Sequence, residues 1–577
     1  MTNKAIPSSF RRRASFAFFV LAAGVLSWRA MDLQFTNREF LQEHGTARYL
    51  RTIESTAERG MIVDRLGVPL AITVPVDSVW AEPKTFTRER HRWPDVASIL
   101  DTTPSHLQAL VEPRLDKNFV YLKRQIAPNV AEALKRAKVR GLRLTEEQKR
   151  FYPEAEVTAH LIGFTNVDDR GQEGVELSFE KILRSESGAN QVIKDRLGRV
   201  VEHVKQVRAA FPGDDVMLSI DRRIQYIAYR ELKEAVLGHK AVAGTMIVLD
   251  AQTGEILALV NQPSFNPNNR GELRGENYRN RAITDVFEPG STIKPITIAA
   301  ALESGKFTPD SNIDTGPGTF KVGQHKITDT KNFGRLTVTG VIEKSSNVGA
   351  SKIALSLDSA ALWKIFHNLG FTEQTGIRLN GESVGRLDNP ENWQDIEKAT
   401  LSFGYGLSIN ALQLARAYTA FANDGLLTPV SITAVEKAPH GERVLSAQTA
   451  RAVREMLLRV TTLGTGKAAQ VDGYQVAGKT GTVHKNTREG YAEDRYLSLF
   501  AGMIPASEPR LVAVVMIDEP RAGGHYGGVV AAPVFASVMR EAVRLLNIPP
   551  DNYQPNLPAE NALRMAEQTA ATRGAGE

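Results

Sequence analysis

The segment that most constrains this chain is Phe287–Pro295, together with the apolar run 296–302 that follows it. A proline and a glycine before Ser291 mark a turn, and the apolar run predicts a helix buried on nearly every side. We expect Ser291 to open this helix. Residues three apart share one helix face, so Lys294 should return over Ser291, and Pro295 is tolerated in the first turns. The sequence therefore predicts a hydroxyl facing an amine at the start of a core helix.

Such a pair has a chemical use, because a serine hydroxyl becomes a good nucleophile only when a neighbouring base takes its proton. A lysine can do this when desolvation or a second cation lowers its pKa from about 10.4. A buried helix supplies the desolvation. The spacing alone is a weak signal, since Ser178 and Lys181 repeat it elsewhere in the chain.

The amino-acid composition limits which folds and functions are possible for this chain. The 577 residues are 42% hydrophobic, which predicts several folded domains. The chain has no cysteine, so disulfides and thiolate catalysis are excluded, and the eleven histidines are too far apart for a local metal motif. We expect no metal and no cofactor. The net charge of +6 is concentrated before residue 14, at Lys4 and 11–13, so no nucleic-acid partner is expected.

An apolar segment at 14–31 follows this basic cluster. At about 1.5 Å per residue it spans about 27 Å, close to the hydrocarbon thickness of about 30 Å. A cleaved signal peptide is the alternative, but Trp28 and Arg29 stand where a small-residue cleavage site would lie. Basic residues before the segment keep the N-terminus in the cytoplasm. We therefore predict a cytoplasmic tail at 1–13, a single membrane anchor at 14–31, and the rest of the chain outside.

Beyond the anchor we predict three parts: a mixed domain at 32–221, a larger domain at 222–548, and a disordered tail at 549–577 rich in Pro, Ala, Asn and Gln. In the larger domain strand patterns lie at both ends of a helical middle, which predicts an α+β fold. One antiparallel sheet should form from remote segments, with the terminal helices on one face and a helical lobe on the other. The predicted strands are 241–249, 255–260, 474–483, 496–504 and 510–517, and the predicted helices include 222–237, 338–357, 412–422 and 533–546.

Two further motifs strengthen the prediction of a catalytic site at the Ser291 segment. Ser345-Ser346-Asn347 lies in the helical middle, and Lys479-Thr480-Gly481-Thr482, whose Lys-Thr-Gly occurs once, lies in a predicted strand. Beside Ser291, the Ser345 hydroxyl can relay a proton to a leaving amine and Asn347 can hold a substrate amide. Lys479 adds a positive potential that keeps the first lysine neutral and attracts a carboxylate.

The strand motif also suits a peptide substrate. Gly481 has no side chain, so a bound peptide can approach the strand edge. The backbone N–H groups of Thr482 and Ser291 can then form an oxyanion hole. Serine, asparagine and lysine in such places are individually more often structural, but the three motifs together, in this order, favour a catalytic site.

The three motifs resemble those of penicillin-binding proteins and serine β-lactamases. Further segments resemble class B penicillin-binding proteins of the septal, cell-division kind over roughly 14–548; they are the anchor, 59–67, 171–176, 287–290 and 527–535. The resemblance implies the penicillin-binding, serine-transpeptidase fold for 222–548. It also implies an elongated pedestal or dimerisation-type domain at 32–221 that engages division partners, where the residues alone favour exposed polar turns.

The resemblance further implies a peptidoglycan D,D-transpeptidase of the bacterial inner membrane, with its catalytic domain in the periplasm. Ser291 would attack the penultimate D-Ala of a stem peptide, with Lys294 as general base, Ser345 as proton relay and Lys479 as electrostatic partner. Asn347, Thr480, Gly481 and Thr482 would bind substrate. β-Lactams, which mimic D-Ala-D-Ala, should acylate Ser291. The implied partners are a polytopic glycosyltransferase and small single-span division proteins.

Two other functions stay open. A serine β-lactamase would need a group that activates the deacylating water, and the glutamates between the second and third motifs, such as Glu373 and Glu397, lack the asparagine four residues on that is typical of class A enzymes. A non-catalytic β-lactam sensor or division scaffold would bind drug or partners without making cross-links.

Overall fold

The computed structural model describes residues 8–36, 50–55, 57–194, 200–269, 275–487 and 490–551. The chain falls into two compact units, one formed by Met1–Arg59 with Arg184–Asp214 and the other by Gly60–Leu183 with Asp215–Glu577. The tail predicted at 549–577 lies, beyond residue 551, outside the described residues.

The first unit contains the N-terminal helix and a small sheet. Helix α1 spans Ser8–Met31, and the segment Arg12–Phe35 is long and apolar enough to cross a membrane. No other helix in the described part of the chain meets that criterion. The sheet is antiparallel, in the order β1-β6-β7, with strands Leu50–Ser55, Gly188–Lys194 and Val200–Arg208.

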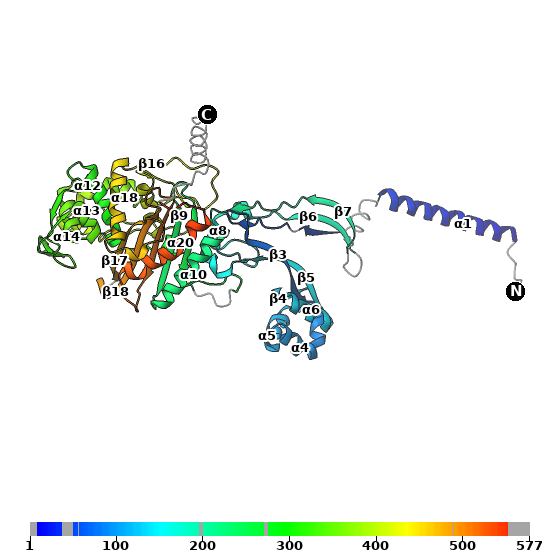
Figure 1. The fold of residues 1–577 in the computed structure, drawn as a ribbon. Coiled ribbons are helices and arrows are strands. Elements are labelled where there is room, and N and C mark those ends of the chain that lie inside the picture. Colours follow the sequence, from blue (N-terminus) through cyan, green and yellow to red (C-terminus); the bar gives the residue numbers. More distant parts are fainter. Residues whose placement is uncertain are drawn as a thin grey trace, which may run out of the picture. The chain divides into compact units, whose positions relative to one another are not determined.

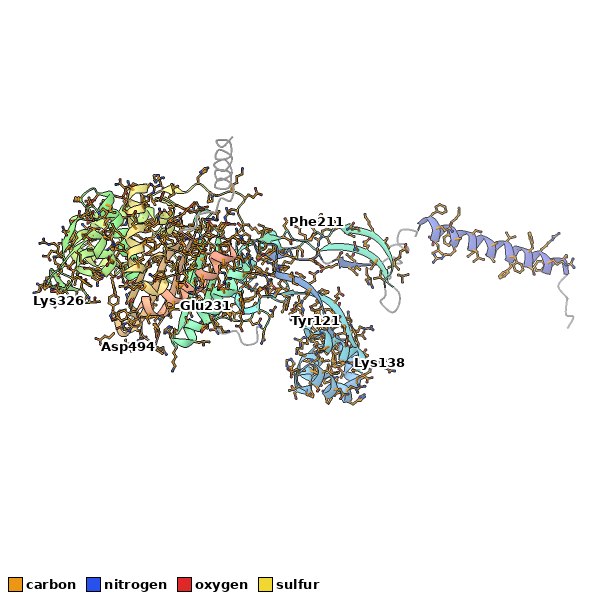
Figure 2. The ribbon with its side chains drawn as sticks, in the orientation of Figure 1. Tyr121, Lys138, Phe211, Glu231, Lys326 and Asp494 are labelled. Carbon is orange, nitrogen blue, oxygen red and sulfur yellow. The ribbon has the colours of Figure 1, made fainter. Side chains whose placement is uncertain are left out.

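The second unit begins with a sheet that carries a small helical module. Strand β3, Pro69–Ala81, pairs with β5, Leu142–Phe151, and with β4, Val120–Ile126. Phe86 and Trp93 stack in the core of the module, and its helices are α4 Trp93–Ile99, α5 Pro104–Val111 and α6 Pro128–Ala137. Tyr121 of β4 and Lys138, which follows α6, are labelled in Figure 2.

The glycine-punctuated segments near residues 59–67 and 171–176 hold buried charges. Asp64 accepts hydrogen bonds from the backbone N–H groups of Leu66 and Val68. Arg150 pairs with Glu176 at 2.7 Å, and both side chains are almost completely buried. Arg150 also donates to the Gly60 carbonyl at 2.7 Å. These charges hold remote segments together in the interior, so exposed polar turns do not describe them.

The large C-terminal part of this unit is built on a five-stranded antiparallel sheet in the order β10-β9-β19-β18-β17. Its strands come from both ends of this part of the chain, as predicted from the sequence. They are β9 Ala243–Asp250, β10 Ile256–Gln262, β17 Ala477–Thr487, β18 Gly490–Ile504 and β19 Leu511–Asp518. Strand β17 lies at one edge, so one side of it is open to other groups.

Alternating side chains of the sheet enter two separate apolar cores. In β9, Met246 and Val248 belong to one core and Ile247 and Leu249 to the other. Helices α10, Arg222–Gly238, and α20, Ala532–Leu545, cover the first face and pack against each other (Figure 1). Helices α12, α17 and α18 belong to the second core and span Lys294–Glu303, Ala411–Ala422 and Ala447–Thr462. The predicted division into terminal helices and a helical lobe is confirmed.

The helix predicted over 338–357 is wrong as a single element. The chain forms α13, Val338–Lys344, and α14, Asn347–Ser356, and between them Ser345 adopts the left-handed conformation with φ 59° and ψ 40°. The contacts of Ser345 described below account for the break.

The remaining elements connect these layers. The hairpin β12–β13, Thr319–Val322 and His325–Thr328, stands beside α14, and its exposed Lys326 is labelled in Figure 2, as is exposed Asp494 of β18. The shorter elements are β2 Ile62–Val63, α3 Pro83–Phe86, α7 Ala159–Ile162, α8 Gly174–Ser178, α9 Glu180–Leu183, β8 Val216–Met217, α11 Arg281–Thr284, β11 Asn312–Asp314, β14 Arg335–Thr337, α15 Ser359–Asn368, α16 Asp395–Leu401, β15 Leu426–Leu427, β16 Glu442–Arg443 and α19 Gly527–Val530.

Candidate active site

The turn that carries Ser291 is a 3-10 turn, Gly290–Ile293, and α12 begins one residue later at Lys294. Ser291 therefore precedes the buried helix, and the prediction that it opens the helix is off by one turn. Gly290 has a positive φ of 54°, and a Cβ at this position would lie 2.3 Å from the side chain of Val483. Only glycine fits, because strand β17 packs directly on the turn.

The Lys294 amine is fully buried and has three hydrogen-bond acceptors around it. They are the Ser345 carbonyl at 2.6 Å, Asn347 Oδ1 at 2.7 Å and Ser345 Oγ at 3.1 Å. Burial lowers the pKa of Lys294 well below its usual value, and the charge of Lys479 lowers it further, although Asp329 opposes both effects. A neutral amine can donate to the two carbonyl oxygens and keep its lone pair for a hydroxyl proton.

Lys479 is also fully buried and lies on the other side of Ser345. Its Nζ donates to Ser345 Oγ at 3.0 Å and to the Thr480 carbonyl at 3.0 Å. Burial lowers the pKa of Lys479 to about 7. The structure thus brings residues of all three motifs together, with the Ser345 hydroxyl bonded to both lysines.

The break between α13 and α14 orients the second motif. Because Ser345 is left-handed, its carbonyl and its hydroxyl both reach Lys294. Asn347 Nδ2 donates to the Thr328 carbonyl at 3.1 Å, which leaves Oδ1 of the amide for the lysine. A non-glycine residue in this conformation costs about 1–3 kcal/mol, so the surrounding contacts must maintain it.

Asp329 makes many of the contacts that maintain this conformation. The sequence did not predict this role, since nothing in the residues around Asp329 distinguishes it. It follows β13, and its carboxylate meets the N-terminus of α14. Oδ1 accepts from the backbone N–H groups of Asn347 at 2.5 Å and Val348 at 3.0 Å, and Oδ2 accepts from the Ser346 hydroxyl at 2.5 Å. A carboxylate at a helix N-terminus also interacts favourably with the helix dipole.

The open edge of β17 has backbone groups that do not pair with β18. The His484 N–H donates to the Tyr405 hydroxyl at 3.3 Å, away from β18. Backbone groups alternate along a strand, so the Thr482 N–H faces the same open edge. A Cβ on Gly481 would lie 3.0 Å from Thr292 and 3.2 Å from the Pro289 carbonyl, so β17 lies close against the turn of Ser291.

The hydroxyl of Thr482 is already oriented. Its Oγ1 accepts a hydrogen bond from the Gly527 N–H at 3.0 Å, so its proton is available for a ligand. A Cβ on Gly527 would lie 2.2 Å from the Leu499 carbonyl and 2.3 Å from the Gly481 carbonyl. This close approach explains the glycine and holds the loop against the strand.

Two cavities, of about 630 and 400 Å³, share Glu288, three residues before Ser291. Glu288 Oε1 accepts from the Gly406 N–H and the Tyr491 hydroxyl, each at 2.9 Å, and burial raises the pKa of Glu288. Glu288 contacts two segments remote in sequence, at Gly406 and Tyr491, so periodicity and spacing did not single it out.

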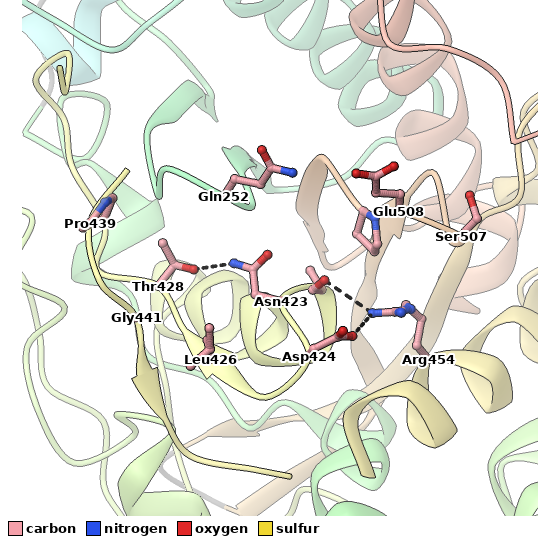
Figure 3. Close-up of a pocket in the computed structure, with 12 residues that line it drawn as sticks. Gln252, Asn423, Asp424, Leu426, Thr428, Pro439, Gly441, Arg454, Ser507 and Glu508 are labelled. Atoms are coloured by element: carbon pink, nitrogen blue, oxygen red, sulfur yellow. Dashed lines mark hydrogen bonds and ion pairs between the residues drawn. The ribbon is translucent and has the colours of Figure 1, made fainter. Parts of the chain in front are cut away.

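A third cavity, of about 460 Å³, is lined by no residue of the three motifs (Figure 3). Its polar side chains bond to one another: Asn423 to Thr428 at 2.6 Å, and Arg454 to Asp424 at 3.1 Å. In the described residues no cluster of three or more His, Asp or Glu side chains could hold a metal ion.

A serine in the turn that leads into a buried lysine, a second hydroxyl bonded to two lysines, and an edge strand with an N–H on its open side are parts that a serine acyl-transfer site needs. A family model for the penicillin binding protein transpeptidase domain matches residues 244–540, and one for the penicillin-binding protein dimerisation domain matches 54–218.

Similar proteins cover nearly the whole chain. The peptidoglycan D,D-transpeptidase FtsI of Escherichia coli K12 is 43% identical over 92% of this chain and 91% of its own length. The probable peptidoglycan D,D-transpeptidase PenA of Neisseria meningitidis serogroup A is 42% identical over 94% of both chains. The chain therefore belongs to the penicillin-binding protein transpeptidase family.

Solved structures match as well. The transpeptidase domain of penicillin-binding protein 3 from Burkholderia pseudomallei is 46% identical, with a TM-score of 0.54, over 58% of this chain and 98% of that one. Penicillin-binding protein 3 from Mycobacterium tuberculosis, solved with aztreonam, is 28% identical, with a TM-score of 0.66, over 86% of this chain and 98% of that one.

Proposed function

We propose that this chain is a peptidoglycan D,D-transpeptidase that works through an acyl-serine on Ser291 and that β-lactams acylate at the same atom. The observation that carries the site assignment is the position of the Lys294 amine, which is buried and bonded to both Ser345 and Asn347. That environment favours the neutral amine, which is the form able to accept a proton.

In the first half-reaction, Ser291 Oγ attacks the carbonyl of the penultimate D-Ala while Lys294 takes the hydroxyl proton. The N–H groups of Thr482 and Ser291 stabilise the oxyanion. Ser345 then passes its proton to the departing amine and is reprotonated from the adjacent lysines, so the C–N bond breaks and terminal D-Ala leaves.

In the second half-reaction, the amine of a neighbouring stem peptide attacks the acyl-serine carbonyl. Its proton returns through Ser345, the C–O bond to Ser291 breaks, and Ser291 recovers its hydroxyl proton from Lys294. Before the terminal D-Ala leaves in the first half-reaction, Thr480 and Thr482 hold its carboxylate with the charge of Lys479, and Asn347 holds a substrate amide beside Gly481.

The organisation we propose around this site is a cytoplasmic tail at 1–13, an anchor at 14–31, a pedestal at 32–221 and the transpeptidase domain at 222–548. The basic cluster before the anchor favours a cytoplasmic N-terminus and a periplasmic catalytic domain. We also propose a polytopic glycosyltransferase and single-span division proteins as partners of the anchor and pedestal.

The test is covalent labelling of the detergent-solubilised full chain with a fluorescent penicillin. Ser291→Ala should abolish labelling, because no other nucleophile is assigned, whereas Ser304→Ala, at the far end of α12, should label like the wild type. Labelling that persists in Ser291→Ala would move the nucleophile elsewhere.

Turnover separates the competing functions. The labelled enzyme should keep its acyl group for minutes or longer, and a cross-linking assay with D-Ala-D-Ala stem peptides should release D-Ala. Rapid hydrolysis of many penicillin equivalents would support a β-lactamase, and labelling without cross-linking would support a sensor or scaffold.

A further inference from the structure

Thr465 lies at the edge of the site without belonging to any of the three motifs. It occupies the turn Gly464–Gly466 that follows α18, and its Oγ1 lies 2.6 Å from Thr480 Oγ1. Among the described residues, no other side chain bonds to either hydroxyl. The contact joins an exposed loop residue to a nearly buried residue of the strand motif.

The turn is held in place by glycines on both sides of Thr465. A Cβ on Gly464 would lie 2.5 Å from the Glu343 carbonyl, so the turn packs on the end of α13, just before the second motif. A Cβ on Gly466 would lie 3.4 Å from the ring of Phe500, and the Gly466 N–H donates to the Val460 carbonyl at 2.9 Å.

A third glycine, Gly528, leaves space for this turn on its other side. A Cβ on Gly528 would lie 2.3 Å from the Thr465 carbonyl and 3.5 Å from the Thr480 side chain. Packing against α13, β18 and α19 therefore determines the position of Thr465, as expected of a residue whose side chain must be held in one place.

Each threonine hydroxyl carries one proton, so the two hydroxyls in contact can form a directed chain. When Thr465 donates to Thr480, the Thr480 oxygen is occupied as an acceptor and its own proton points elsewhere. Hydrogen bonds in such a chain polarise and strengthen one another. The hydroxyl proton of Thr482, on the same strand, is also available for donation to a ligand, because the Thr482 oxygen already accepts from the Gly527 N–H.

We propose that Thr465 is a positioning residue for recognition of the substrate's terminal carboxylate: its hydroxyl donates to Thr480, which in turn donates to the carboxylate. This inference rests on the proposed function and adds to it a residue that orients the carboxylate contact. The ligands it concerns are peptides and β-lactams with a free carboxylate, and neutral esters are outside its reach.

The test measures acylation of the full-length enzyme by benzylpenicillin and by its methyl ester, which lacks the carboxylate. Thr465→Val keeps the shape and removes the hydroxyl. We expect it to weaken initial binding of benzylpenicillin about three- to tenfold, the range of one neutral hydrogen bond, with little change in the limiting acylation rate. Acylation by the methyl ester should be unchanged, and Thr465→Ser should restore binding.

Thr462→Val is the matched control, because the Thr462 hydroxyl bonds back to Leu458 of its own helix and does not contact Thr480. It should bind both ligands like the wild type. The proposal is overturned if Thr465→Val binds benzylpenicillin normally, or if both ligands are weakened equally, which would indicate a structural role alone.

Failure of the proposed transpeptidase function would give a different experimental result from failure of the Thr465 proposal. If Ser291→Ala still reacted, the nucleophile would be wrong, yet the ratio of acid to ester binding would still report on Thr465.

Discussion

Lys294 and Lys479 are both fully buried and both bond to Ser345 Oγ, yet their other partners differ. Lys294 meets two further side-chain and carbonyl acceptors, whereas Lys479 meets only the Thr480 carbonyl besides the hydroxyl. Burial is the largest cause of the lowered pKa of each lysine. The charge of Lys479 also lowers the pKa of Lys294, so the protonation of Lys294 depends on that of Lys479.

This pair predicts a bell-shaped pH profile for acylation. The rate should rise with pH as Lys294 loses its proton and fall above about pH 7 as Lys479 loses the charge that attracts the carboxylate. In Lys479→Arg the guanidinium stays protonated, since its pKa exceeds about 12, so the alkaline limb should move above pH 9. Stopped-flow acylation rates across pH 5–10 measure both limbs.

Lys467→Arg, an exposed lysine outside the motifs, should leave both limbs unchanged. An alkaline limb near pH 7 that persists in Lys479→Arg would assign that titration to another group.

At the scale of elements, the site depends on where helices stop. Helix α13 ends in a left-handed residue, α14 begins on a carboxylate that follows a hairpin, and α12 begins just after the 3-10 turn that holds Ser291. Backbone groups at helix ends lack intrahelical partners, so they can be directed to neighbouring segments. The motif residues all lie at such ends or on the edge strand β17.

Asp329→Ala tests this dependence. The change removes three hydrogen bonds from the start of α14, so it should lower the free energy of unfolding by about 1–3 kcal/mol. It should also slow acylation about ten- to hundredfold, because Ser345 and Asn347 lose their fixed positions. Thermal unfolding and penicillin acylation measure the two effects.

Asp310→Ala, at an exposed position of the same lobe, serves as the control and should match the wild type in both assays. Normal acylation by Asp329→Ala would show that the second motif holds its geometry without the cap.

At the scale of the whole molecule, buried charges join segments far apart in sequence. Arg150 of β5 contacts Gly60 and Glu176, which belong to the two glycine-punctuated segments. Removing one partner of a buried ion pair leaves an uncompensated charge, which is far more destabilising than losing a surface pair.

Arg150→Met should therefore lower the free energy of unfolding by about 3–5 kcal/mol, measured by urea unfolding of the full chain. The double variant Arg150→Met, Glu176→Leu should recover most of the loss, because neither charge of this ion pair is left without its partner. Arg143→Met is the control: its pair with Glu82 is largely exposed, so the change should stay below about 1 kcal/mol. Equal losses in the single and double variants would argue against this explanation.

The apolar N-terminal helix, the layered fold and the three motifs were predictable from the sequence because each rests on local patterns. The apolar run 14–31, the periodicity of the strands and the turn before Ser291 are properties of neighbouring residues. The single Lys-Thr-Gly motif was placed in a strand from its sequence, and the strand order of the structure puts that strand at the edge of the sheet.

Only the tertiary structure decided the break at Ser345 and the roles of Asp329, Glu288 and Thr465. Each depends on contacts between residues remote in the chain, such as Thr465 with Thr480 and Glu288 with Tyr491. The lowered pKa of the two lysines likewise follows from burial, which is a property of the packed molecule. Local sequence determines which side chains are available, and packing determines which of them meet and in what protonation state.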